Sequence, residues 1–180
     1  ITWSLVGSEM CIRDRYVNGT QETNSSTVTI DNTNTDPVLI GKLGSANIYG
    51  EGLIDEVALF NSALSASDIT SIYNSGAPGD ITSLNPVGWW RMGDNDGGTG
   101  TTITDQGSGG NNGTLVNGPT FSTDVPPLPA WNGNSYALSF DGSDDFVNVD
   151  GVATEIASMT NFSCSAWIKK GTEGTFPIIF

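Results

Sequence analysis

Side chains with oxygen atoms suited to a hard cation gather in one loop of this sequence. Residues 94–112 are dense in Gly, Asp, Asn and Thr, a composition typical of a long surface loop. Calcium takes carboxylate and carbonyl oxygens from loops of this kind. Asp55 adds a carboxylate within an apolar stretch, where it needs hydrogen-bond donors or a cation. We therefore predict a calcium site with four carboxylate ligands: Asp55, Asp94, Asp96 and Asp105.

A second explanation of these acidic residues stays open. Backbone amides or a Lys or Arg partner could satisfy Asp55 without any metal. The spacing of an EF-hand is absent, and Asp144 and Asp145 fit a solvated turn. The acidic excess is also compatible with a role in solubility alone.

The adjacent acids Asp55 and Glu56 raise the question of a glycoside hydrolase. Neighbouring residues of a strand project to opposite faces, so these two carboxylates are not expected to act together at one glycosidic bond. The chain contains no histidine, which removes the usual general base and the commonest transition-metal ligand. We predict that the protein is not an enzyme.

Aromatic and amide side chains supply candidates for ligand binding. Trp131 lies in a stretch of Pro, Gly and Asn and is the tryptophan best placed to offer a flat face to a sugar. Trp89 and Trp90 alternate along one strand, so at least one of them is expected in the core. Together with the amides of the Asp/Asn/Gly-rich loop, the predicted ligand-binding residues are Trp131, Asn111 and Asn112.

The charge balance limits the partners of the protein. The chain has 180 residues, with 20 acidic and 6 basic side chains and a formal charge of −14. Such a charge repels phosphate backbones and anionic membrane surfaces, so we expect neither nucleic-acid binding nor membrane insertion. Two cysteines, Cys11 and Cys164, make no disulfide framework.

The pattern of apolar residues predicts an all-β protein with one short helix. Residues 53–60 are apolar on both alternate faces, as in an inner strand of a two-sheet sandwich. Ser65 and Asp68 then fit a helix N-cap, and Gly76 fits a left-handed C-cap. Asn18-Gly19 is the strongest hairpin signal of the chain. Further alternating stretches predict strands at 27–30, 38–42, 87–92, 114–116, 136–140, 146–149 and 162–168.

The stretch from residue 52 to residue 76 resembles the C-terminal signature of laminin-G-like, concanavalin A-type jelly rolls. The family pattern is roughly G-x-I-D-E-V-x-[IL]-[FY]-N-x-A-L-[ST]-x-x-[DE]-[IL]. The matching residues are Gly52, Ile54, Asp55, Glu56, Val57, Leu59, Phe60, Asn61, Ala63, Leu64, Ser65, Asp68 and Ile69. The resemblance implies a two-sheet antiparallel sandwich, a fold that hosts lectins, glycosidases, adhesins and spacers. It also implies a structural calcium near the matching loop and strand.

The order of motifs predicts an unusual domain organisation. The segments WRMGD, LSFDGSDDFV and FSCSAWIK, all beyond residue 86, resemble the front half of the same family. We therefore expect residues 16–76 to be the rear half of one sandwich, 77–86 a linker, and 87–180 the front half of a second. The two halves could instead pack as one permuted and incomplete sandwich. Residues 1–15 resemble translated sequencing-adapter sequence and are expected to be non-native.

These observations favour a non-catalytic carbohydrate-binding or adhesion module. The resemblance implies a tandem-repeat protein that is secreted or displayed on a cell or virion surface, with a glycan or cell-surface polysaccharide and neighbouring repeats as partners. A structural spacer without any ligand is the alternative, followed by a fragment of a glycoside hydrolase.

Overall fold

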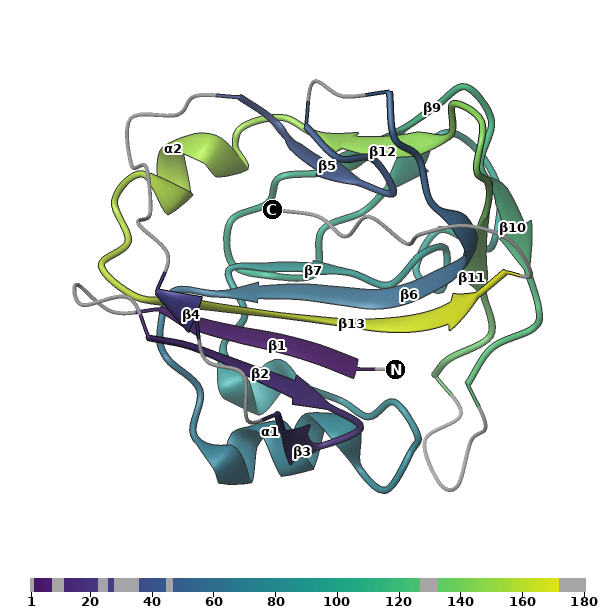
Figure 1. Ribbon diagram of the computed structural model, residues 1–180. Helices are drawn as coiled ribbons and strands as arrows, with labels where there is room; N and C mark the ends of the chain where they lie inside the picture. Colours follow the sequence, from purple (N-terminus) through teal and green to yellow (C-terminus); the bar gives the residue numbers. More distant parts are fainter. Residues whose placement is uncertain are drawn as a thin grey trace.

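The protein is a sandwich of two antiparallel β-sheets with a helix on the outer side of the larger sheet (Figure 1). This computed structural model describes residues 2–7, 12–22, 26–27, 36–44, 47–126 and 133–171. Figure 1 shows β5 and β12 on one side, the long strands β6 and β13 in the middle, and α1 on the other side. The predicted all-β sandwich is confirmed.

The larger sheet has the order β10-β11-β6-β13-β1-β2-β3, with β7 paired to β6 and β4 paired to β2. Its strands are β1 (Thr2–Gly7), β2 (Ile12–Val17), β3 (Thr20–Gln21), β4 (Ser26–Thr27), β6 (Glu51–Phe60), β7 (Gly88–Trp90), β10 (Thr120–Ser122), β11 (Ala137–Asp141) and β13 (Phe162–Lys170).

The smaller sheet has the order β5-β12-β9-β8. Its strands are β5 (Val38–Ile40), β8 (Thr102–Ile103), β9 (Gly113–Val116) and β12 (Phe146–Val149). The helices are α1 (Ala66–Tyr73), the 3-10 turn η1 (Thr82–Leu84) and α2 (Val152–Ile156).

Strands from distant parts of the sequence alternate within both sheets. β6 is hydrogen-bonded to β13 along one edge, and to β11 and β7 along the other. In the smaller sheet β12 lies between β5 and β9. The two strands described within residues 36–60, β5 and β6, therefore pair with strands that come after residue 86.

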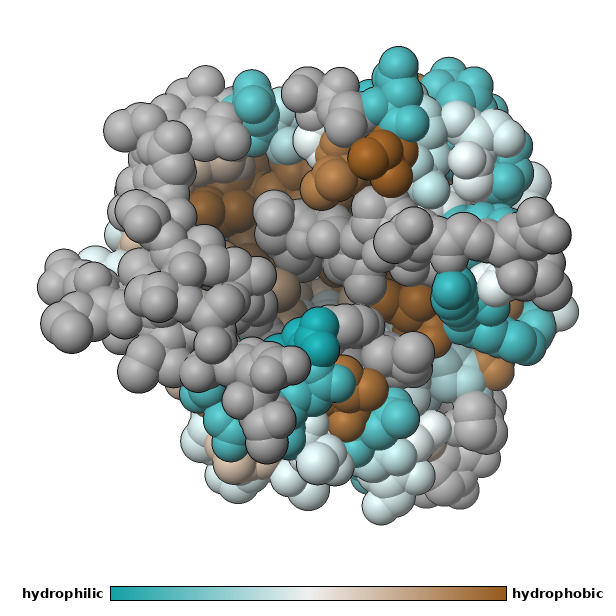
Figure 2. Space-filling view, viewed as in Figure 1, coloured by the Kyte–Doolittle hydropathy of each residue, from teal (hydrophilic) through white to brown (hydrophobic). Residues whose placement is uncertain are grey.

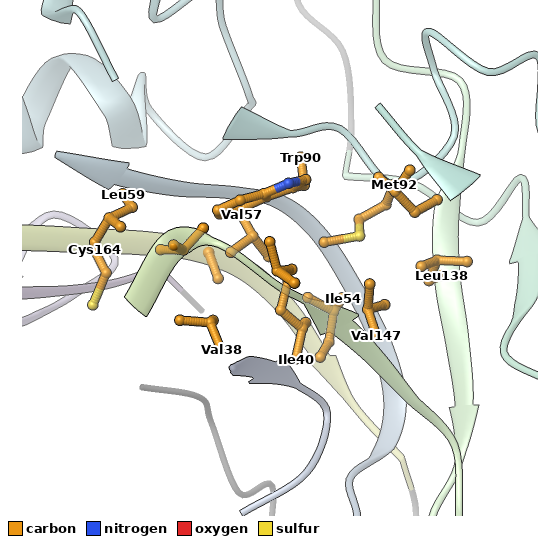
Figure 3. Packing of buried hydrophobic residues seen from close by; sticks show 14 of the residues in the cluster. Val38, Ile40, Ile54, Val57, Leu59, Trp90, Met92, Leu138, Val147 and Cys164 are labelled. Carbon is orange, nitrogen blue, oxygen red and sulfur yellow. The ribbon is translucent and has the colours of Figure 1, made fainter. Parts of the chain in front are cut away.

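The main core fills the space between the two sheets. β6 contributes Ile54, Val57 and Leu59, which meet Ile40 from β5 and Val147 from β12 (Figure 3). Trp90 of β7 belongs to the same cluster and is fully buried. Burial of large apolar side chains on both layers is the main force that joins them, at roughly 25 cal/mol for each Å² removed from water.

A second apolar cluster joins the other face of the larger sheet to α1. Ala58, Phe60 and Trp89 from the sheet pack with Ile69 and Ile72 of the helix. Trp89 and Trp90 therefore lie in different clusters, as the alternation predicts, and both are buried.

The ends of α1 confirm one prediction and correct another. Ser65 is the N-cap, and its side chain and that of Asp68 form the reciprocal capping box. The left-handed C-cap is Asn74 (φ 41°), two residues before the predicted Gly76. Asn tolerates this conformation because its short polar side chain bonds locally, so the helix ends earlier than the glycine signal indicates.

The structure also contains elements that the sequence does not signal. The sequence patterns predict neither α2, β8 nor β10. The backbone of β1 pairs with β13 and β2, so residues 2–7 occupy an interior position of the larger sheet. This pairing does not test the predicted non-native origin of residues 1–15, which stays a prediction.

Candidate functional site

The central strand β6 carries a β-bulge at Asp55 and Glu56. Asp55 pairs with Trp167 and Ala58 with Ser165, so three steps along β6 face two steps along β13. Glu56 has φ +47°, which is unusual for a residue with a side chain. On the other edge of β6, β11 pairs up to Ile54 and β7 begins at Val57, so the bulge coincides with a gap between these two strands.

This bulge overturns the expectation that Asp55 and Glu56 point to opposite faces. Ile54 and Val57 both belong to the main core, although three positions separate them. The extra residue shifts the alternation, a known effect of bulges. As a result, carboxylate oxygens of Asp55, Glu56 and Asp94 lie within 4.8 Å of one another. We call these three residues the carboxylate cluster.

Arg91 and Trp89 supply donors to the carboxylate cluster. Trp89 Nε1 donates to Glu56 Oε2 at 2.6 Å, and Arg91 Nε donates to Glu56 Oε1 at 3.0 Å. Arg91 Nη2 donates to Asp94 Oδ2, also at 3.0 Å. The guanidinium thus bridges two of the three carboxylates, and it lies 5.2 Å from the centre of the Trp89 ring.

Asp94 and Asn134 complete the site from two loops. Asp94 Oδ1 accepts from the backbone amides of Ser135 and Tyr136 at 2.6 and 2.9 Å. Asn134 Nδ2 donates to Asp55 Oδ2 at 2.9 Å, and the backbone amide of Glu56 donates to Asp55 Oδ1 at 2.7 Å. Among the described residues, buried Asn134 Oδ1 has no hydrogen-bond partner.

Burial sets the protonation of the cluster. Burial, reinforced by the neighbouring charge of Glu56, raises the pKa of Asp55 well above its ordinary value. Burial likewise raises the pKa of Glu56 from 4.5 to about 7, against the opposing effect of Arg91. The pKa of Asp94 is also raised by burial. With all three groups ionised, one guanidinium faces three carboxylates, so the site favours a proton or a further cation.

The donor set fits a hard divalent cation. Carboxylate oxygens and an amide oxygen without a donor are the ligand types that calcium takes, at 2.3–2.6 Å. Arg91 also satisfies part of the cluster, so the alternative of an Arg partner is physically present in the same site. Asp55, Asp94, Glu56 and Asn134 are the residues that would hold the ion.

The structure does not bring the other two predicted metal ligands to the cluster. Asp96 accepts from the hydroxyl of Thr104 at 2.5 Å and from its backbone amide at 3.1 Å. Asp105 accepts from the backbone amides of Trp89, Gly107 and Asn111 at 2.7–2.9 Å. Asp105 thus holds the Gly-rich loop to β7, and Asp96 holds it to Thr104, the residue after β8. Amino-acid composition alone does not distinguish this structural role from metal binding.

The predicted ligand-binding residues lie in different surroundings. Asn112 Oδ1 accepts from the backbone amide of Asp105 at 3.0 Å. Asn111 Nδ2 donates to Glu155 Oε1 at 2.9 Å, and its carbonyl accepts from Trp90 Nε1 at 2.8 Å. Trp131 lies outside the described residues.

A polar pocket of about 360 Å³ opens between the Gly-rich loop and α2. It lies beside Asn111, which is hydrogen-bonded to the lining residue Glu155. Val87 and Met159 are its apolar lining residues. The polar lining comes from Asn61, Ser108, Gly109, Glu155, Ser158 and Thr160. No pattern in the sequence indicates this pocket, because α2 and the loop meet only in the folded chain.

Comparison with known families agrees with the fold. Residues 1–70 match the family model described as the concanavalin A-like lectin/glucanases superfamily. The laminin-G-like resemblance is confirmed for the matched residues, and the resemblance of the segments beyond residue 86 stays a prediction. The match includes the strand, turn and capped start of α1 that carry the motif, and it begins at residue 1. No curated protein and no solved structure matches the chain significantly.

Sequence reasoning missed three members of the carboxylate cluster site and the pocket acid. The prediction that Asp55 and Glu56 point to opposite faces is wrong, and neither Arg91, Asn134 nor Glu155 is among the predicted site residues. Arg91 follows a tryptophan pair and precedes Asp94, so its position among motif residues was the available signal. Nothing in the sequence around Asn134 indicates its contact with Asp55, 79 residues away.

Proposed function

We propose that this protein is a non-catalytic carbohydrate-binding module of a secreted or surface-displayed protein. The match of residues 1–70 to the concanavalin A-like lectin/glucanases superfamily carries this proposal, since it supports a carbohydrate-binding or adhesion-type module at the family level. The polar pocket beside the Gly-rich loop has hydroxyl, amide and carboxylate groups suited to sugar hydroxyls. Glycans and neighbouring repeats are the partners that we propose.

The burial of the only paired acids of β6 supports the non-catalytic part of the proposal. Asp55 and Glu56 are close together, but they are 2% and 5% exposed. A glycosidase needs its two carboxyl groups on either side of the scissile bond. A saccharide cannot lie between two groups that are nearly closed to solvent, so proximity here serves the fold.

We further propose a structural role for calcium at the carboxylate cluster. Three carboxylates against one guanidinium, together with the partnerless Asn134 Oδ1, are the observations that support it. An ion there would link β6 to the loops of Asp94 and Asn134 and replace a proton on the buried acids. The expected result is a melting temperature that rises with calcium and falls with a chelator. Equal melting in both conditions would exclude a resident calcium.

A glycan array run with calcium and with a chelator tests the proposed function. Binding of at least one glycan class in either condition is expected. The spacer alternative predicts no binding in either condition.

Within the described residues no helix combines the length and the apolar character that crossing a bilayer requires.

A further inference from the structure

Glu155 is a carboxylate that the fold holds at the pocket. Asn111 donates to Glu155 Oε1 at 2.9 Å. Asn111 is itself fixed, because its backbone amide donates to Asp105 and its carbonyl accepts from Trp90 Nε1. Two successive hydrogen bonds, from Trp90 of the main core to Asn111 and from Asn111 to Glu155, therefore position one oxygen of the Glu155 carboxylate.

The neighbouring glycine makes room for this carboxylate. A Cβ added at Gly109 would lie 2.6 Å from Glu155 Oε1 and 2.8 Å from Oε2. A side chain at this position would force the carboxylate to shift, so this glycine leaves the space that the acid occupies. Gly109 is also held in place, since its amide donates to the carbonyl of Val87 at 2.8 Å.

The second oxygen of Glu155 is available to a ligand. Among the described residues, Glu155 takes part in no ion pair, and the one donor to its carboxylate is Asn111. No Lys or Arg lines the pocket. In a chain of net charge −14, a carboxylate of this kind attracts a cationic donor.

The other polar residues that line the pocket favour a cationic ligand that also carries hydroxyl groups. The hydroxyl of Ser158 donates to the Glu155 carbonyl at 2.7 Å, which leaves its lone pairs free to accept. Ser108, Thr160 and Asn61 place further polar groups around the rim of the pocket. A simple alkyl ammonium has no hydroxyl to offer these groups, whereas a sugar ring has several. The volume, about 360 Å³, is at the small end for ligand pockets and suits one sugar unit.

We propose that this pocket binds an amino sugar, with the free ammonium group on Glu155 and the ring hydroxyls on the surrounding polar side chains. This inference rests on the proposed carbohydrate-binding function and adds the substrate class. It predicts that a deacetylated glucosamine trisaccharide binds about tenfold or more tightly than its N-acetylated counterpart, since a charge-assisted hydrogen bond is lost on acetylation. The preference should weaken with salt.

Calorimetric titration with the two trisaccharides and with a neutral glucose trisaccharide tests the proposal. Glu155→Gln should lower affinity for the deacetylated sugar about tenfold or more and leave the neutral sugar unchanged. Gly109→Ala should do the same by displacing the carboxylate. Asp150→Asn is the matched control, because it removes an exposed acid five residues away and should change affinity less than about twofold. Circular dichroism of each variant checks folding.

The outcomes separate this inference from the proposed function. Equal binding of acetylated and deacetylated sugars, or unchanged binding after Glu155→Gln, would overturn the amino-sugar proposal while carbohydrate binding stands. A lysine tripeptide that binds through Glu155 when no sugar does would overturn both. Binding of the deacetylated sugar alone, lost in both pocket variants and kept in Asp150→Asn, is the supporting result.

Discussion

Asp55 and Asp105 are two buried aspartates whose surroundings differ in the kind of donor that faces them. Asp105 receives three backbone amides, from Trp89, Gly107 and Asn111. Asp55 receives one backbone amide and one side-chain amide, and it lies within 4.8 Å of two further carboxylates. One acid is therefore satisfied by the chain alone, whereas the other belongs to a group with more negative charge than its donors balance.

The difference shows how similar residues take different roles. An aspartate at a loop end can accept several amides because the loop wraps around it, as residues 105–111 do. An aspartate at a bulge has few amides nearby, because its neighbours in the strand already pair with β13, β11 or β7. It then depends on side chains, protons or ions. The variants below test this distinction.

Removal of Arg91 should have the largest effect. Arg91→Met leaves Glu56 and Asp94 without their bridging guanidinium, at a cost of about 3–5 kcal/mol in the free energy of unfolding at pH 8. The cost should be smaller at pH 5, where Glu56, whose pKa is raised to about 7, holds a proton. Urea unfolding at both pH values measures it.

Lys169→Met provides the matched control for that experiment. The Lys169 ion pair with Asp124 is largely exposed, with side chains 66% and 58% accessible, so its loss should cost less than about 1 kcal/mol. An equal cost for both variants would contradict a special role for Arg91.

Loss of the Asp105 carboxylate should be the next largest effect. Asp105→Ala leaves three backbone amides without their acceptor and should lower the free energy of unfolding by about 3 kcal/mol or more. Asp105→Asn keeps one oxygen and should cost roughly half as much. Chemical denaturation compares the two. If Asp105→Ala were harmless, water would have to replace all three bonds.

Glu56 should contribute to the pH dependence of stability, alongside Asp55 and Asp94, whose pKa values burial also raises. The pKa of Glu56 is raised from 4.5 to about 7 in the folded state, so the folded protein binds more protons than the unfolded chain between these values. Stability is therefore highest below pH 4.5 with respect to this group and falls by about 3 kcal/mol as the pH rises to 7, at about 1.4 kcal/mol for each pKa unit.

Denaturation in chelator at several pH values measures the dependence of stability on pH, and Glu56→Gln should make that slope smaller. Gln presents an amide to one of the two donors, so the variant is expected to be less stable overall. The test is the slope alone. A slope in Glu56→Gln that equals that of the parent would assign the titration to another group.

The smallest effect is expected for Asp55→Asn. In chelator this change keeps the shape and removes an acid whose charged form burial already disfavours, so stability should change by no more than about 1 kcal/mol in either direction. The rise in melting temperature with calcium should disappear. Asp96→Asn, outside the cluster, should retain it, and a retained rise in Asp55→Asn would place any ion elsewhere.

The sequence predicts the regular parts of the fold better than its exceptions. Residues 53–60 are apolar on both sides, and β6 is indeed an inner strand with a core on each face. The reciprocal cap of Ser65 and Asp68 depends on contacts three residues apart, which makes it readable from the sequence. Both features are set by local chemistry.

The candidate site was only partly predictable for the opposite reason. Loop composition, the apolar surroundings of Asp55 and the family resemblance together predict that Asp55 and Asp94 share one site. The bulge that turns Glu56 toward them depends on the register with β13, more than 100 positions away in sequence. Asn134 and Glu155 likewise reach their partners only through tertiary contacts. Strand alternation assumes regular pairing, and a bulge breaks that assumption.

The position of β6 has a consequence for how the molecule withstands a cut in its chain. β6 is bonded on both edges to strands that follow residue 86, and β12 holds β5 in the other layer. A protease that nicks the connector near the exposed Asp80 would therefore release no fragment. The two pieces would remain one particle on gel filtration and separate only in denaturant, so the module could be produced as two complementing polypeptides.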